Sequence, residues 1–410
     1  MSDAPDGYRE PDGPASQQGM RRANLALVLG TVARLRTASR AQLSDSTGLT
    51  RPAVGSLVSE LIDAGLVRER GVSLEGRVGR PSTALTVSNH GPCGLGLEIG
   101  VEHLGACVVD LRHEVRVQIR RPAPARGREP QETLGSLAEL AREAVAEATG
   151  HGLEPAGLAV AVPGLVTKAG IVAHAPNLGW REVDVAAELR PLLPEPLCGL
   201  LVEVDNEANL GALAELWHGA VGWDFVHVSA GAGIGGAIVA EGKLLRGRRG
   251  FAGELGHMPV YPDGPACTCG SHGCLEQYAG EQALLRKCGL TDTPGDRISL
   301  LAAAAAEGRT EVLGALEDAG RALGIALAGA VNLVDPEKVI LGGAYAELAA
   351  WLMPGMQKEL GSRVRIRPWN PAGLSVSALR REGPVVGAAT SVVQRVIGDP
   401  ASVRSHFRRP

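Results

Sequence analysis

The stretch GFAGELGHMPVYPDGPACTCGSHGCLE, residues 250–276, carries three cysteines in a C-x-C-x4-C array and a histidine shortly before them. Cys267, Cys269, Cys274 and His257 together form a complete tetrahedral ligand set for Zn²⁺, with no position left for a catalytic water. The residues between them are mostly Gly, Pro, Asp, Ser and Thr, which bury too little apolar surface to order the loop without a metal. Buried or disulfide-paired cysteines are the alternative, but the tight spacing favours a metal. The stretch therefore predicts a structural zinc loop that holds neighbouring side chains around a second ligand.

The same stretch resembles a family signature, because G-x-A-G-E-x-G-H is followed by C-x-C-G-x-x-G-C-x-E. It is similar to the signature of the ROK family, which is named after repressors, open reading frames and sugar kinases. The resemblance implies that His257 is a zinc ligand that also faces a sugar, and that Glu254 and Glu276 contact sugar hydroxyls. It also implies a two-lobed α/β body with the duplicated actin-like (ribonuclease H-like) fold of sugar kinases.

Composition and charge indicate a globular chain with an uneven distribution of charge. Its 410 residues are 45% hydrophobic, which predicts two or three domains with sizeable cores. No apolar run reaches the length of a membrane span and the N-terminus is polar, so we expect a soluble, cytoplasmic protein. Residues 20–90 contain ten Arg and five acidic residues, whereas the net charge of the whole chain is −4. A basic module on an acidic body favours a nucleic-acid partner.

The basic module, residues 20–88, has the pattern of a winged helix-turn-helix, and residues 1–19 are expected to be a disordered tail. We expect a first helix from Asn24, a second helix that begins with the capping-box pair Ser39 and Gln42, and a third helix capped by Thr50. Strands at 66–70 and 82–87 would form the wing. The apolar residues of the third helix recur at helical spacing and must face inward; they are Val54, Leu57, Val58, Leu61 and Ile62.

The opposite face of the third helix carries small or polar residues, as a helix that enters the major groove requires. Arg77 and Arg80 in the predicted wing suit a narrow minor groove. A helical docking domain with a solvated basic face is the alternative, and the wing favours DNA. The expected DNA contacts are Arg40, Thr50, Arg51, Pro52, Ala53, Ser56, Ser59, Arg77 and Arg80.

Beyond a linker at 89–92, strand and helix patterns alternate twice over, which predicts two α/β lobes with a cleft between them. We place the first lobe at 93–204 plus 384–397, and the second lobe, with the zinc loop, at 205–383. The expected strands are 94–99, 104–110, 115–120, 157–166, 200–204, 225–229, 235–239 and 339–341, and the expected helices are 130–148, 209–217 and 317–334.

Four segments should line the cleft. Residues 162–166 and 175–180 resemble the sugar-side loops of the ROK family, and the others are residues 204–215 and the zinc loop. Where ROK kinases carry an Asn that contacts the sugar and an Asp that is the general base, this chain has Asn206-Glu207. The extra methylene of Glu displaces the carboxylate by roughly an ångström or more, enough to spoil proton transfer. A surface helix start is the alternative for this pair. The expected sugar contacts are Asn177, Asn206, Glu207, Glu254, His257 and Glu276, and no catalytic residue is expected.

The phosphate side departs further from the kinase pattern. The D-x-G-G-T motif of ROK kinases corresponds here to Glu98-Ile99-Gly100-Val101-Glu102, so a glycine and a hydroxyl donor are replaced by Val101 and Glu102. The second phosphate loop, at 231–236, has Ala232 in place of its threonine. Its remaining glycines are a weak signal, because such loops also serve as plain tight turns.

These patterns predict a sugar-responsive transcriptional repressor of the ROK family, closest in pattern to its xylose-repressor type. We expect it to bind operator DNA as a homodimer or homotetramer, to bind structural Zn²⁺, and to take a sugar or sugar phosphate as effector. The alternatives are an ATP-dependent, glucokinase-like sugar kinase with a DNA-binding extension, and a scaffold with a vestigial cleft. The sequence does not name the sugar.

Overall fold

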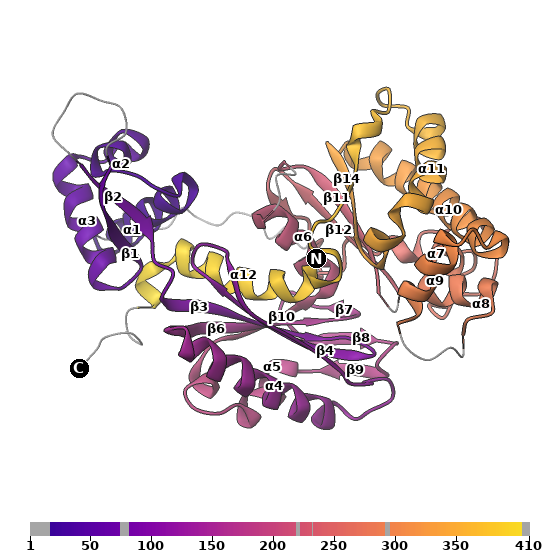
Figure 1. Cartoon of the computed structure of the whole chain (residues 1–410), viewed down its shortest axis with the longest axis horizontal. Coiled ribbons are helices and arrows are strands. Elements are labelled where there is room, and N and C mark those ends of the chain that lie inside the picture. The colour runs from indigo at the N-terminus through magenta and orange to yellow at the C-terminus, as the bar shows by residue number, and fades with distance from the viewer. Residues whose placement is uncertain (1–16, 74–81, 219–221, 232, 292–295, 404–410) are drawn as a thin grey trace, which may run out of the picture. The chain divides into compact units, whose positions relative to one another are not determined.

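A computed structural model describes residues 17–73, 82–218, 222–231, 233–291 and 296–403 of the chain (Figure 1). The chain forms two compact units. Unit 1 consists of residues 1–92 and 394–410, and unit 2 consists of residues 93–393. Among the described helices, none combines the length and the apolar character needed to cross a membrane.

In unit 1, the described residues 17–73 and 82–87 form three helices and a hairpin in the order of a winged helix-turn-helix. Helix α1 begins at Gln17, before the predicted start at Asn24, and so includes the last three residues of the predicted tail. The hairpin strands pair antiparallel, and their connection, residues 74–81 with Arg77 and Arg80, lies outside the described residues. The elements are α1 (Gln17–Leu35), α2 (Arg40–Thr47), α3 (Arg51–Asp63), β1 (Val67–Ser73) and β2 (Ser82–Val87).

The local signals of the helix-turn-helix are mostly confirmed. Ser39 Oγ accepts a hydrogen bond from the Gln42 amide at 3.2 Å, and Gln42 Oε1 accepts one from the Ser39 amide at 2.8 Å, which completes the capping box. Thr50 occupies the N-cap position of α3, but its side chain makes no capping hydrogen bond, contrary to the prediction. Four of the five residues of α3 that were predicted to face inward are buried, namely Val54, Leu57, Val58 and Leu61. The fifth, Ile62, is half-buried.

The C-terminal part of the chain completes unit 1. Helix α12 (Gly383–Gly398) begins in unit 2, and its last residues, from Gln394, belong to unit 1 together with η6 (Pro400–Ser402). The Arg22 guanidinium of α1 forms an ion pair with the Asp399 carboxylate, which follows α12 directly. The sequence had placed residues 394–397 in the first α/β lobe; the contacts of the segment that follows them, Asp399 and η6, with α1 could not be recognised from local pattern.

Unit 2 contains two five-stranded sheets. The first has the strand order β10-β6-β3-β4-β5 and the second has the order β13-β12-β11-β14-β15 (Figure 1). Each sheet combines antiparallel pairs, such as β3–β4 and β11–β12, with parallel pairs, such as β6–β10 and β11–β14. The strands are β3 (Gly91–Ile99), β4 (His103–Asp110), β5 (Val115–Pro122), β6 (Leu153–Val162), β10 (Val202–Asn206), β11 (Phe225–Ala230), β12 (Ile234–Ala240), β13 (Lys243–Leu244), β14 (Lys338–Gly343) and β15 (Leu374–Val376).

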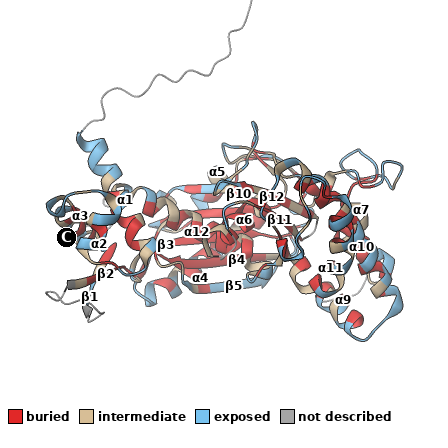
Figure 2. Ribbon diagram, turned by 90° about the horizontal axis from the view of Figure 1, so that it is seen from above, coloured by how far each residue is buried: buried red, intermediate tan, exposed pale blue. Residues whose placement is uncertain are grey.

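Helix α6 (Glu207–His218) packs against both sheets. Its Leu210 and Leu213 share a buried cluster with Ala159 and Ala161 of β6, whereas Ala212 lies in a cluster with strands of the second sheet. The strands and α6 are largely buried (Figure 2). Because α6 contacts both lobes, its N-terminal residue is positioned between them. The other helices of unit 2 are α4 (Pro130–Gly150), α5 (Val185–Leu189), α7 (Glu276–Ala279), α8 (Glu281–Cys288), α9 (Arg297–Ala306), α10 (Thr310–Val334) and α11 (Ala344–Arg363).

Three predicted boundaries in unit 2 are wrong. The strand expected at 157–166 is interrupted at Pro163-Gly164 and resumes as β7 (Leu165–Val166), which pairs with β8 (Val172–Ala175) and β9 (Trp180–Val183) in a small sheet. Gly164 has φ 111°, and a Cβ there would lie 2.5 Å from the His174 carbonyl oxygen, so the chain turns where only glycine fits. Strand β3 begins within the predicted linker, and α10 begins before residue 317.

Candidate functional site

The four predicted metal ligands lie together in unit 2. The ligand atoms of His257, Cys267, Cys269 and Cys274 all lie within 4.8 Å of one another. The Cys269 and Cys274 sulfurs are 3.7 Å apart, and the Cys267 sulfur is 3.8 Å from His257 Nδ1. Thiolates that bind Zn²⁺ tetrahedrally at about 2.3 Å have sulfurs about 3.8 Å apart. The cluster therefore fits a tetrahedral metal ion.

The loop that carries these ligands is held by backbone hydrogen bonds and by close packing of its backbone at Gly273. His257 ends the short helix η3 (Leu255–His257), and Pro259 forms a β-bridge with Cys274. Gly273 has φ 65°, and a Cβ there would lie 1.6 Å from the Tyr261 carbonyl oxygen. Leu255, Val260 and Leu275 join the hydrophobic core, whereas residues 262–273 between them are mostly Gly, Pro, Cys and small polar residues, so metal ligation is a source of order for that part of the loop.

A cavity of about 420 Å³ lies beside the cluster, and we call it the zinc-loop cavity. Its walls come from segments far apart in the sequence: the β6–β7 turn, the loop after β8, the start of α6, the loop before β12 and the zinc loop. All six predicted sugar contacts line it, namely Asn177, Asn206, Glu207, Glu254, His257 and Glu276. The fold thus brings the predicted residues to one place, and their contacts with a sugar stay a prediction.

Glu276 and Glu254 are two of the carboxylates of this cavity. Glu276 Oε2 accepts a hydrogen bond from the Ile234 amide at 3.1 Å, and a Cβ at Gly233 would come within 2.3 Å of the same oxygen. Burial, against a smaller opposing effect of His257, raises the pKa of Glu254. A carboxylate that lines the cavity and is fixed by a backbone hydrogen bond, as Glu276 is, is a suitable acceptor for a hydroxyl group.

Asn206 has a structural role that the sequence did not reveal. Its Oδ1 accepts hydrogen bonds from the Ala208 and Asn209 amides at 2.8 and 3.2 Å, so the side chain caps α6. Its Nδ2 donates to the Gly164 carbonyl at 2.8 Å. Only one N–H of the amide is left for a ligand.

Glu207, the first residue of α6, lines both this cavity and a second one. Burial and, after it, the charge of Glu98 raise the pKa of Glu207 to about 7. A carboxyl with this pKa exists in both protonation states near neutral pH, so it can donate or accept a hydrogen bond.

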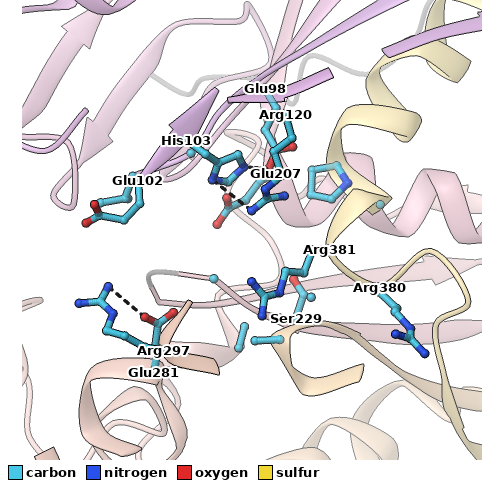
Figure 3. A pocket seen from close by; sticks show the side chains of 18 of the residues that line it. Glu98, Glu102, His103, Arg120, Glu207, Ser229, Glu281, Arg297, Arg380 and Arg381 are labelled. Carbon is cyan, nitrogen blue, oxygen red and sulfur yellow. Dashed lines mark hydrogen bonds and ion pairs between the residues drawn. The ribbon is translucent and has the colours of Figure 1, made fainter. Parts of the chain in front are cut away.

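The second cavity, of about 190 Å³, lies on the other side of Glu207, and we call it the arginine cavity because five arginines line it. In Figure 3, Glu98, His103 and Glu207 lie on one side of this cavity, and Ser229, Arg297 and Arg381 lie on the other. The segment that corresponds to the kinase motif D-x-G-G-T lines it as well, through Glu98, Gly100, Val101 and Glu102.

His103 is a residue that sequence reasoning missed. Its Nε2 lies 3.2 Å from Glu98 Oε1, and its ring covers Gly100 so closely that a Cβ at Gly100 would lie 2.2 Å from a ring carbon. The imidazole thus occupies the space above the backbone of the first phosphate-loop segment. The only sequence signal is that a histidine follows the altered motif directly.

The glycines of the second phosphate loop have packing roles. A Cβ at Gly235 would lie 2.7 Å from the Ala208 Cβ of α6, and one at Gly236 would lie 2.6 Å from the Gly253 carbonyl oxygen. Gly233, as described above, leaves room for Glu276. These three glycines are therefore explained by close packing without a phosphate, and Ala232 lies outside the described residues.

The described DNA candidates are exposed or half-buried at the surface of unit 1. Thr50, Arg51, Pro52, Ser56 and Ser59 are exposed, and Ala53 is half-buried. Two of the candidates already have partners, because Arg40 Nη2 lies 2.9 Å from Glu69 Oε1 and Arg21 Nη2 lies 3.4 Å from Ser56 Oγ. The first turn of α3 contains no acidic residue.

Three comparisons with known proteins agree with this geometry. A xylose repressor from Caldicellulosiruptor bescii is 30% identical over 401 residues, which span 93% of this chain and 98% of the repressor. A crystal structure of a ROK family transcriptional regulator, described as a homologue of the E. coli MLC protein, covers 94% of this chain and 99% of its own, with a TM-score of 0.76 and 26% identity. A ROK family glucokinase from Streptomyces griseus, solved with glucose and AMPPNP, covers 73% of this chain and 98% of its own, with a TM-score of 0.61 and 29% identity.

The repressor and the regulator cover nearly the whole chain and so include both units, whereas the glucokinase covers 73% of the chain, a share about as long as unit 2. The sequence pattern of the ROK family itself matches residues 94–395, which is most of the chain. The protein belongs to the ROK family.

Proposed function

We propose that this protein is a sugar-responsive transcriptional repressor in which unit 1 binds operator DNA and the zinc-loop cavity of unit 2 binds the sugar effector. The observation that carries the proposal is the combination of a helix-turn-helix unit with a cavity that keeps the sugar-side residues of the family. The repressor and the transcriptional regulator described above match along both units, which supports the same conclusion.

In this proposal the metal is Zn²⁺, bound by His257, Cys267, Cys269 and Cys274. With four protein ligands the ion has no open position, and it supplies folding free energy to the loop rather than chemistry. Its role is to hold Glu254 and Glu276 at fixed positions in the zinc-loop cavity. Carboxylates that are held in place bind hydroxyl groups with a smaller loss of conformational entropy.

Sugar binding acts on operator binding through a conformational equilibrium. The sugar must bind one conformation of unit 2 more tightly than the other, by a few kcal/mol for a useful switch. We expect the protein to act as a homodimer or homotetramer in the cytoplasm. A two-fold arrangement of helix-turn-helix units corresponds to an inverted-repeat operator.

The second candidate, an ATP-dependent sugar kinase, is favoured by the likeness of unit 2 to a glucokinase. Three features of the chain speak against it. His103 covers Gly100, where the backbone of a kinase would approach phosphate; Glu102 replaces a hydroxyl donor; and Glu207 replaces the shorter general base. Phosphoryl transfer depends on positioning and on stabilising negative charge, and these replacements oppose both.

The test is a gel-shift titration of the protein on DNA from its own promoter, repeated with a panel of free and phosphorylated sugars. We expect specific binding to an inverted repeat and a change in operator affinity with one class of sugar. Specific DNA binding that no sugar alters, together with sugar phosphorylation by ATP, would reject the proposal in favour of the kinase.

A further inference from the structure

The small three-stranded sheet of unit 2 forms one wall of the zinc-loop cavity. Its strand order is β7-β8-β9. Leu165 of β7 is the register partner of His174 of β8, and His174 is the register partner of Arg181 of β9. All three residues line the cavity, and we call them the small-sheet row. None of them belongs to the six predicted sugar contacts, so the row is a part of the cavity that those contacts do not explain.

The row lies on the face of the small sheet that is turned away from the core of the first lobe. Each row residue has a buried sequence neighbour in that core; these neighbours are Val166, Ala175 and Trp180. Successive residues of a strand point to opposite faces of a sheet. The core therefore fixes the backbone of the row, and the side chains of the row are left to face the cavity.

The row leads away from the residues that are expected to hold a sugar ring. At its inner end, Leu165 follows Gly164, whose carbonyl accepts the hydrogen bond from Asn206 Nδ2 at 2.8 Å. Its outer end, Arg181, lies on the edge strand β9. Directly opposed side chains of an antiparallel pair lie about 5 Å apart, so the row spans about 10 Å. This span exceeds the width of one pyranose ring, and a monosaccharide bound at the inner end leaves Arg181 without a contact.

The side chains of the row suit a carbohydrate. Arg181 is exposed, and among the described residues no carboxylate oxygen lies within 4.0 Å of its guanidinium. Within the same residues the His174 side chain makes no hydrogen bond. Guanidinium and imidazole groups bind hydroxyl and ring oxygens, and Leu165 offers an apolar surface to the C–H face of a ring. An apolar wall with a few polar groups is the usual composition of a ligand cavity.

The charge of the cavity favours a neutral group on the row over an anionic one. Glu207, Glu254 and Glu276 line the same cavity, whereas Arg181 is the only arginine or lysine among its lining residues. Burial and the charge of Glu98 raise the pKa of Glu207 to about 7, so this carboxyl is roughly half protonated at neutral pH. Two carboxylates still face one guanidinium, and the cavity has no net positive charge that would attract a phosphate or a sugar acid.

We propose that the zinc-loop cavity binds a disaccharide or another neutral glycoside, with one ring at the six predicted sugar contacts and the second group on the small-sheet row. This inference rests on the proposed function, since it names the class of effector that the same cavity takes. The cavity volume of about 420 Å³ agrees with it, because cavities of roughly 300–1,000 Å³ bind drug-sized ligands. Arg181 is then a specificity residue, which contacts the second group of a glycoside and does not contact a monosaccharide.

Calorimetric titration of the full chain with matched sugars tests the second-ring site. The pairs are xylose with xylobiose, glucose with cellobiose, and glucose with maltose. We expect one disaccharide to bind about tenfold more tightly than its own monosaccharide, and Arg181→Gln to remove this gain while monosaccharide affinity stays within about twofold. Arg142→Gln is the matched control, because Arg142 is an exposed arginine of α4 that does not line the cavity, and it should change neither affinity.

The possible outcomes separate this inference from the proposed function. Equal affinity for monosaccharides and disaccharides, a gain that R181Q retains, or an equal loss in R142Q would overturn the second-ring site and leave the proposed function standing. Glucose 6-phosphate that binds more tightly than every disaccharide would overturn it in favour of an anionic effector. Failure of all these sugars to bind would count against the proposed function itself, and the inference would fall with it.

Discussion

Glu207→Gln should make the stability of unit 2 less sensitive to pH. Burial and the nearby Glu98 charge raise the pKa of this carboxyl from 4.5 to about 7. Because its folded-state pKa is higher than its unfolded-state pKa, its contribution to stability is complete below pH 4.5 and is lost as the pH rises through 7. A difference of about 2.5 pKa units corresponds to about 3 kcal/mol. This is an upper limit, since the side chain keeps partial contact with solvent.

Urea unfolding from pH 4 to 8.5, followed by tryptophan fluorescence, measures this effect on unit 2 alone, because all five tryptophans lie there. The free energy of unfolding of the variant minus that of the wild type should rise by up to about 3 kcal/mol between pH 4.5 and 8. Other titrating groups, including the metal ligands, contribute to both proteins and cancel in the difference. Glu147→Gln, an exposed position on α4, gives the baseline for losing a carboxylate. If the difference in unfolding free energy between variant and wild type stayed constant or fell as the pH rises, the assignment of Glu207 as a destabilising charge would be refuted.

Three further predictions concern metal, DNA and catalysis. Purified protein should contain about one zinc per chain by elemental analysis. The variant Cys269→Ser should lose both the metal and sugar binding, whereas the control variant Cys288→Ser should keep both. Metal-free protein that binds sugar with full affinity would contradict the scaffold role of the metal. Arg80→Ala should weaken operator binding and reduce the slope of log affinity against log salt concentration by about one. The control variant Arg121→Ala should change neither. An unchanged slope in Arg80→Ala would contradict the assignment of Arg80 to the minor groove. Incubation with sugar, ATP and Mg²⁺ should give no phosphorylated sugar, and turnover at roughly 1 per second or faster would exclude a regulator without kinase activity.

The features that the sequence predicted well are those in which interacting residues are close in the chain. The Ser39–Gln42 capping box is set by a spacing of three residues, and the C-x-C-x4-C array brings its ligands together within one loop. The resemblance to a family then supplied what spacing alone could not. It associated Asn177 and Asn206 with the zinc loop, and the fold brings all of them to one cavity.

The features that the sequence did not predict depend on contacts between distant segments. Arg120 and Arg380 meet at one cavity only because β5 and the 3-10 turn η5 (Arg380–Glu382) adjoin in the fold, and each appears in the sequence as an ordinary surface arginine. The position of His103 over Gly100 depends on the turn between β3 and β4. The capping role of Asn206 required knowledge that α6 begins at the next residue, which a pattern starting at 209 did not provide.

The ion pair between Arg22 and Asp399 has a consequence for the order of events during synthesis. Its partners are separated by 377 residues, so a ribosome that adds about 5–20 residues per second must continue for roughly 20–75 s after Arg22 before it reaches Asp399. Unit 1, which contains the first helices to emerge, is thus completed last. A nascent or prematurely terminated chain lacks the segment that closes on α1, so its unit 1 is unfinished. In the proposed function, competence to occupy an operator is in this way tied to translation of the segment that follows α12.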